Sequence, residues 1–182
     1  MNEGIIRIGP AGDPPGAQPP EDEIGAFVAG PPFICRGPST AVIVPWIQVF
    51  STGLLVMIDV RFRASATPES ARLELRRIMH GDDEPMPGRL HVEIGYPDGT
   101  ITRNLRGPER PSPGSRQRSA LRLGAMQSGP RWELVYWVRG LPTGGAAELR
   151  LGWPDRQVDF AGFGIPAAAV GAAVRRVRNP WG

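Results

Sequence analysis

The chain lacks lysine altogether: all 21 of its basic residues are arginines. A GC-rich genome favours arginine codons over lysine codons, and the high alanine, glycine and proline content has the same origin. The single cysteine, Cys35, excludes an internal disulfide framework. Neither histidine, His80 or His91, belongs to a catalytic motif, and His91 with Glu93 supplies at most half a metal site. The sequence therefore predicts no catalytic residue, no metal and no cofactor.

Long apolar runs are also missing. The longest lipid-like stretch, Ala167–Val174, is far shorter than the roughly 20 residues that span a bilayer as a helix. The first residues lack the basic start and apolar run that are typical of a signal peptide. These features predict a cytoplasmic protein that does not contact a membrane.

Glycine and proline are abundant, with 24 and 21 residues respectively, which favours turns and irregular ends over long helices. Residues 1–32 combine this composition with few large apolar side chains, so we expect a disordered tail there. A chain of 182 residues is long enough for one domain with a sizeable core. We therefore expect a single domain over residues 33–182.

Period-two alternation is the strongest structural signal. Apolar and polar residues alternate from Val56 to Phe62 and from Leu149 to Trp153, and both predict half-buried strands. Pro45 indicates a strand edge or bulge, and residues 96–99 have turn chemistry. Residues 140–145 read as a hairpin loop that joins the strands at 132–139 and 148–153.

Helices are few in the pattern. Residues 166–177 are rich in alanine, begin with proline and end with arginines, which predicts a short helix. Residues 68–79 fit either a short helix or a strand. Strands that follow one another without repeated helices indicate an antiparallel β-sandwich or a partly open barrel, with one short C-terminal helix.

One segment is strongly basic. Between residues 103 and 122 there are six arginines and one acid, Glu109, which gives a local net charge of +5. Its proline and serine content predicts a flexible solvated loop at 104–119, and it contains no aromatic residue for base stacking. Binding of an anion or a nucleic acid remains an alternative. Its candidate contacts are Arg103, Arg106, Arg110, Arg116, Arg118 and Arg122.

The C-terminal third combines a tryptophan-containing strand, Gly-Leu-Pro at 140–142, a strand that ends in Trp-Pro and an alanine/arginine helix. This combination resembles a group of uncharacterised β-rich proteins from GC-rich bacteria, over residues 38–182. The resemblance implies a compact β domain. It carries over no activity and no functional residue.

The sequence favours a non-catalytic domain that acts by binding another protein, and it leaves the oligomeric state open. Exposed apolar side chains mark such interfaces, so we expect the partner surface at Trp137, Trp153 or Trp181. Two alternatives remain. One is anion or nucleic-acid binding through the arginine-rich loop, and the other is an enzyme with His80 or His91 beside a carboxylate in a deep pocket.

Overall fold

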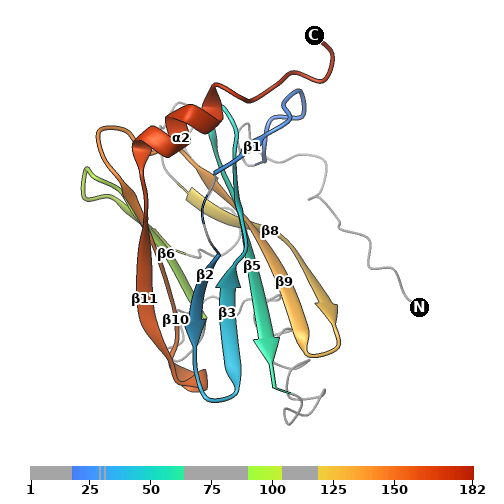
Figure 1. The fold of residues 1–182 in the computed structure, drawn as a ribbon, viewed down its shortest axis with the longest axis vertical. Coiled ribbons are helices and arrows are strands. Elements are labelled where there is room, and N and C mark those ends of the chain that lie inside the picture. The colour runs from blue at the N-terminus through green and yellow to red at the C-terminus, as the bar shows by residue number, and fades with distance from the viewer. Residues whose placement is uncertain (1–17, 29, 31, 64–89, 104–118) are drawn as a thin grey trace.

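The computed structural model describes residues 18–28, 30, 32–63, 90–103 and 119–182. In this part of the chain, strands form two antiparallel sheets whose inner faces share one core, and a helix lies at one end of them (Figure 1). The predicted mainly β fold with one C-terminal helix is confirmed. The helix or strand predicted at 68–79 lies outside the described residues, as does His80.

The larger sheet contains seven strands, and the second contains four. The strands of the larger sheet are β1 (Ala26–Phe27), β2 (Phe33–Arg36), β3 (Thr40–Val44), β4 (Ile47–Val49), β5 (Gly53–Phe62), β8 (Ser119–Ser128) and β9 (Arg131–Arg139). The second sheet is formed by β6 (His91–Gly95), β7 (Ile101–Arg103), β10 (Ala147–Trp153) and β11 (Val158–Ile165). The short 3-10 helix η1 (Pro154–Arg156) precedes β11, and helix α2 (Ala167–Val174) follows it.

Strand β5 is the centre of the larger sheet. β9 pairs with one edge of β5, while β3 and β4 share the other edge, with β2 and β1 outside them. The register moves by one residue between β3 and β4, because Val42 lies opposite Val60 whereas Ile47 lies opposite Val56. Pro45 lies at this step, where its missing N–H interrupts the ladder. Of the two predicted alternatives at Pro45, a strand edge or a bulge, this register step agrees with the bulge.

The second sheet has the order β11-β10-β6-β7. A tight turn joins β6 to β7, and in it the Tyr96 N–H donates to the Thr100 carbonyl at 2.8 Å. Gly99 has φ 81°, a left-handed conformation that glycine adopts without a steric penalty. The predicted turn at 96–99 is confirmed.

The core between the sheets is aromatic at one end. Phe62 packs edge-on against Trp132 and Trp153, with ring centroids 4.5 and 6.0 Å away. Such pairs contribute about 0.5–1.5 kcal/mol each beyond the area that they bury. The Nε1 atoms of both tryptophans and the Thr40 hydroxyl are buried without a hydrogen-bond partner in the part of the chain that the structure describes. Ring packing rather than hydrogen bonding therefore holds these side chains.

The predicted hairpin between the strands at 132–139 and 148–153 is wrong. β9 pairs with β5 and β8, whereas β10 pairs with β6 and β11 in the other sheet. Residues 140–146 therefore cross from one sheet to the other. The nine residues of β9 all pair with β5. A hairpin with the seven-residue β10 would give a shorter ladder.

Part of the predicted tail belongs to the fold. Ala26 pairs with Val49 in β1–β4, and Ile24 forms a backbone bridge with Arg178 near the C-terminus. The many prolines of residues 1–32 dominate the average composition and mask this short apolar run. Ordered structure therefore begins before residue 33.

Helix α2 is shorter than the predicted span of 166–177. It buries Val170 and Ala173 against the core at the end of the sheets where β1 lies (Figure 1). Pro166 is its N-cap residue, and the helix ends at Val174. Arginines follow Val174, and their charged groups must reach water. The run of residues that can pack against the core therefore ends at Val174.

Candidate interaction surface

The outer face of the larger sheet carries a cross-strand row of arginines. Arg36 on β2 lies opposite Ala41 on β3, which lies opposite Arg61 on β5, which in turn lies opposite Arg131 on β9. These side chains point away from the core because the alternate residues of β5, such as Val60, point into it. Arg36 is exposed, and the Arg61 and Arg131 side chains are 57% and 44% exposed. We call Arg36, Arg61 and Arg131 the arginine row.

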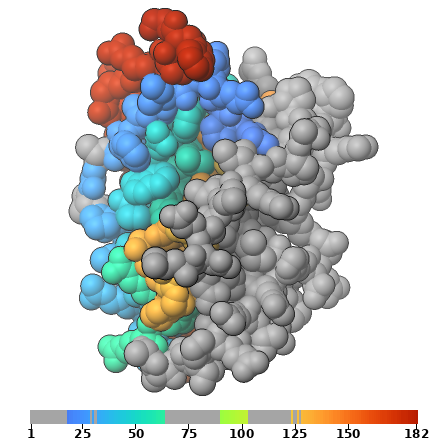
Figure 2. Space-filling view, turned by 90° about the vertical axis from the view of Figure 1, so that its right-hand side faces the viewer, coloured from blue at the N-terminus to red at the C-terminus, as the bar shows by residue number. Residues whose placement is uncertain are grey.

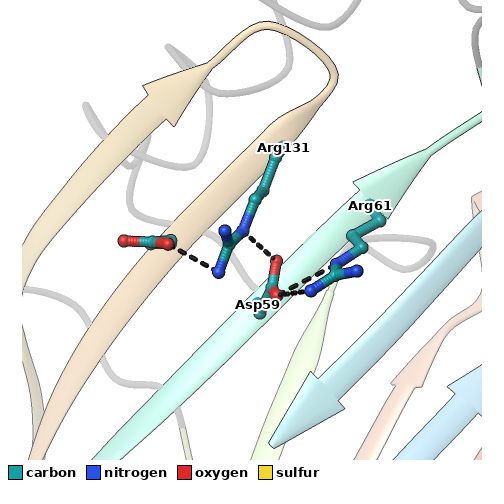
Figure 3. Close-up of polar contacts among 4 residues, drawn as sticks. Asp59, Arg61 and Arg131 are labelled. Carbon is teal, nitrogen blue, oxygen red and sulfur yellow. Dashed lines mark hydrogen bonds and ion pairs between the residues drawn. The ribbon is translucent and has the colours of Figure 1, made fainter. Parts of the chain in front are cut away.

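A buried carboxylate holds two members of this row together (Figure 3). Asp59 Oδ2 accepts from Arg61 Nε at 3.0 Å and from Nη2 at 2.9 Å, while its Oδ1 accepts from Arg131 Nε at 3.0 Å. Arg131 Nη2 also lies 2.7 Å from Glu133 Oε1. The Asp59 side chain is only 1% exposed, so the guanidinium groups replace the water that it loses.

The cluster compensates for an unfavourable cross-strand arrangement. Arg61 lies directly opposite Arg131, and Asp59 lies directly opposite Glu133, so like charges face each other on neighbouring strands. The attractive contacts run along β5, from Arg61 to Asp59, and diagonally, from Arg131 to Asp59. The hydrogen bond and the charge of Asp59 raise the pKa of Arg61 further above its ordinary value. Asp59 therefore holds the two guanidinium groups side by side.

The geometry of the cluster leaves little for catalysis. Both oxygens of Asp59 already accept hydrogen bonds from arginine and the side chain is buried, so this carboxylate is engaged in the ion cluster. Among the described residues, no three His, Cys, Asp or Glu side chains gather as a metal site would require. His91 lies against the Phe160 ring, with ring centroids 5.4 Å apart.

Cys35 is the remaining chemically reactive side chain in the described region. It is 4% exposed and belongs to the core, and this burial raises the pKa of its thiol. A raised pKa disfavours the thiolate, which is the nucleophilic form. We therefore regard Cys35 as a small apolar core residue.

A line of apolar side chains lies beside the arginine row on the same face. Ile34 is 40% exposed and pairs with Ile43, and Phe27 is 53% exposed and meets Trp46 edge-on at 5.6 Å. Ile43 and Trp46 are half-buried. A solvated sheet face normally carries polar residues at these positions. We call Phe27, Ile34, Ile43 and Trp46 the apolar strip.

The apolar strip and the arginine row form one surface, which we call the interaction face. Figure 2 shows one side of the molecule, with the C-terminal residues in red at the top, residues of β1–β5 in blue to green beneath them, and residues of the β8–β9 hairpin in orange beside the green ones. The Ile34–Ile43 pair continues across the sheet to Asp59, so the apolar strip and the ion cluster share one cross-strand row of the outer face.

The three tryptophans predicted as the partner surface differ in their exposure to solvent. Trp137 and Trp153 are fully buried, so their prediction as contact residues is wrong. Trp153 points into the core, and Trp137 packs against Phe50 on the other side of the larger sheet, with ring centroids 5.7 Å apart. Trp181 is 85% exposed, beyond the end of α2.

The arginines predicted as anion contacts lie largely outside the described residues. Arg106, Arg110, Arg116 and Arg118 all fall there. Arg103 ends β7 and Arg122 lies within β8. Whether these six arginines form one surface stays a prediction.

Sequence reasoning did not find the interaction face. Its arginines come from positions 36, 61 and 131, and only strand pairing brings them together. Alternation along residues 40–44 does place Ala41 and Ile43 on one face. It does not show whether that face is the outer one.

Comparison with protein-family models, with curated proteins and with solved structures found no match for this chain. In the part of the chain that the structure describes, no helix has the length and apolar character needed to cross a membrane.

Proposed function

We propose that this chain is a non-catalytic protein-interaction domain that binds its partner through the interaction face. The observation that carries the proposal is the apolar strip, where Phe27 and Ile34 remain about half exposed although both lie within paired strands. Contiguous exposed apolar surface with a polar border is the usual mark of a protein interface.

The partner binds through side chains rather than by adding a strand at β1. Arg176 Nη2 donates to the Phe27 carbonyl at 2.7 Å and covers the backbone there. A basic side chain over an edge strand blocks pairing with another chain. The side chains of Phe27 and Ile34 remain open.

The test is a capture experiment with the tagged full chain and native lysate. Ile34→Asp places a charge in the apolar strip, and the matched control Ile101→Asp makes the same change at an exposed strand residue of the second sheet. We expect the wild type and the control to retain the same protein, and Ile34→Asp to lose it. Equal capture by both variants contradicts the proposal.

A nuclease-treated arm addresses the predicted alternative of nucleic-acid binding. Material that binds the wild type only before nuclease treatment assigns binding to a nucleic acid. Thermal unfolding of each variant confirms that the loss of capture does not come from loss of the fold.

A further inference from the structure

We propose that the partner segment is acidic, with carboxylates that contact the arginine row and apolar side chains that cover the apolar strip. This inference rests on the proposed function, because it specifies the chemistry of the partner at the same face. It follows from the charges beside the strip and from the way Asp59 fixes them.

The separation between apolar and arginine positions on the interaction face defines the separation required between apolar and acidic residues of the partner. Arg36 and Ile34 are two residues apart on β2, as are Ala41 and Ile43 on β3. Two residues of a strand span about 7 Å, so the backbone positions of Ile34 and Arg36 lie about that far apart. Arg36 and Arg61 are separated by the β3 strand, and the small side chain of Ala41 leaves the space between them open.

Asp59 prepares the arginine row for an anion. It binds Nε and Nη2 of Arg61 and Nε of Arg131, and Nη1 of each arginine makes no hydrogen bond or ion pair with another described residue. The guanidinium groups are thus held in place from below while their outer donors face solvent. Arginines that are already ordered lose less conformational entropy when they bind a carboxylate.

The charge balance of the face favours an acidic partner. Arg36, Arg61, Arg63 and Arg131 are exposed at this end of the sheet, whereas the acids there, among the residues that the structure describes, are Asp59 and Glu133. Both acids are already paired with arginine, which leaves an excess of positive charge. In the described part of the chain, a second copy of the same face brings no unpaired carboxylate, so these residues do not complement themselves.

The two residues of the apolar strip that lie nearest the arginine row favour a protein over a nucleic acid, whereas the rings of Phe27 and Trp46 lie farther along the strip. Ile34 and Ile43, the apolar residues nearest the arginine row, are aliphatic and provide no ring on which a base would stack. Burying Ile34 and Ile43 against apolar side chains of another protein gives the most favourable free energy of binding. Carboxylates next to apolar side chains are therefore the chemistry that fits the whole face.

The test is a selection of displayed random peptides on the immobilised full chain. We expect the selected peptides to combine Asp or Glu with Leu, Ile, Phe or Trp, and to be lost on the Ile34→Asp variant. Their binding should weaken several-fold between about 0.05 and 0.5 M NaCl, since salt screens exposed charges. Selected peptides that are neutral or basic, yet still depend on Ile34, overturn the acidic-partner inference and leave the proposed function standing.

Charge reversal at one exposed arginine isolates the row. Arg36→Glu should weaken binding of an acidic peptide about three- to tenfold, the range for exchanging one exposed ion pair for repulsion. Arg150→Glu, on the outer face of the second sheet, is the matched control and should leave it unchanged. Equal affinities of the two variants contradict the assignment. Peptides that bind equally to wild type and Ile34→Asp contradict the proposed function itself.

Discussion

Replacing the buried Asp59 by asparagine tests the physical account of the arginine row. The amide keeps the shape of the side chain and removes its charge. One of its two ends becomes an N–H donor, which then faces either Arg131 Nε or Arg61 Nε and Nη2. The substitution therefore removes one or two charged hydrogen bonds and leaves Arg61 opposite Arg131 without a counter-charge.

The size of the effect follows from burial. Removing one partner of a fully buried ion pair costs about 3–5 kcal/mol. Here only Asp59 is buried, and the arginines remain 57% and 44% exposed, so water stabilises the charges that are left. We expect Asp59→Asn to lower the free energy of unfolding by about 1–3 kcal/mol, a range reduced from that for buried pairs because exposed pairs contribute little.

Urea unfolding of both proteins measures this difference. Repeating it in about 1 M NaCl, where the Debye length is about 3 Å, should reduce the difference because the repulsion between the arginines is screened. Asp159→Asn is the matched control, since Asp159 is exposed on β11, and its effect should stay within about 0.5 kcal/mol. A loss below about 0.5 kcal/mol for Asp59→Asn refutes the idea that Asp59 holds the row together.

Three other substitutions or treatments have defined outcomes. Gly53→Ala should destabilise the fold by about 1–3 kcal/mol in urea unfolding, because its Cβ would overlap the Val138 carbonyl oxygen. A Cβ at Gly95 would lie 4.0 Å from its nearest neighbour, so Gly95→Ala should have a far smaller effect. Equal losses of unfolding free energy in the two variants contradict the argument. Burial raises the pKa of the Cys35 thiol in the folded chain above its value of about 8.5 in the unfolded chain. The contribution of the neutral thiol to the free energy of unfolding is therefore complete below the unfolded-state pKa, and it is lost as the pH rises through the folded-state pKa. Thiol labelling at pH 8 should therefore be far slower in the native than in the unfolded chain, and similar rates contradict burial. Trp181→Ala should change stability by less than about 0.5 kcal/mol and move the fluorescence maximum to shorter wavelength, because it removes an indole that is 85% exposed; an unchanged spectrum would contradict that exposure.

Local patterns predicted the elements that depend on local chemistry. Alternation from Val56 to Phe62 identifies β5, and the residues of the 96–99 turn carry their own conformational preferences. Strand partners depend on residues far apart in the chain. Residues 140–145 contain the turn chemistry of a hairpin, yet β9 forms its ladder with β5 instead. Turn residues permit a reversal of the chain, but the length and burial of the competing ladders decide the pairing.

The same limit applies to the interaction face. Arg36, Arg61 and Arg131 have no sequence relationship, and their alignment depends on three separate strand registers. The tryptophans misled the prediction because a large aromatic residue gains as much from a core as from an interface. Trp137 lies on the outer side of β9 and is nevertheless buried, so strand periodicity alone did not determine its exposure.

Asp59 also helps to determine the pairing register of β5 with β9, which the apolar residues of β5 do not determine by themselves. Residues 54–58 are apolar on both faces of the sheet, so a shift against β9 would not place a polar side chain in the core. Asp59 is the first charged residue after this run, and its hydrogen bond to Arg131 Nε forms only when Asp59 lies opposite Glu133. At the other end of the ladder, Gly53 lies too close to the Val138 carbonyl for any larger residue to be placed there by a shift. The ion cluster and the glycine therefore fix the β5–β9 register from both ends, and this register places Arg61 opposite Arg131. If this is correct, Asp59→Asn should weaken peptide binding more than Arg36→Ala does, because it releases two arginines of the row instead of removing one.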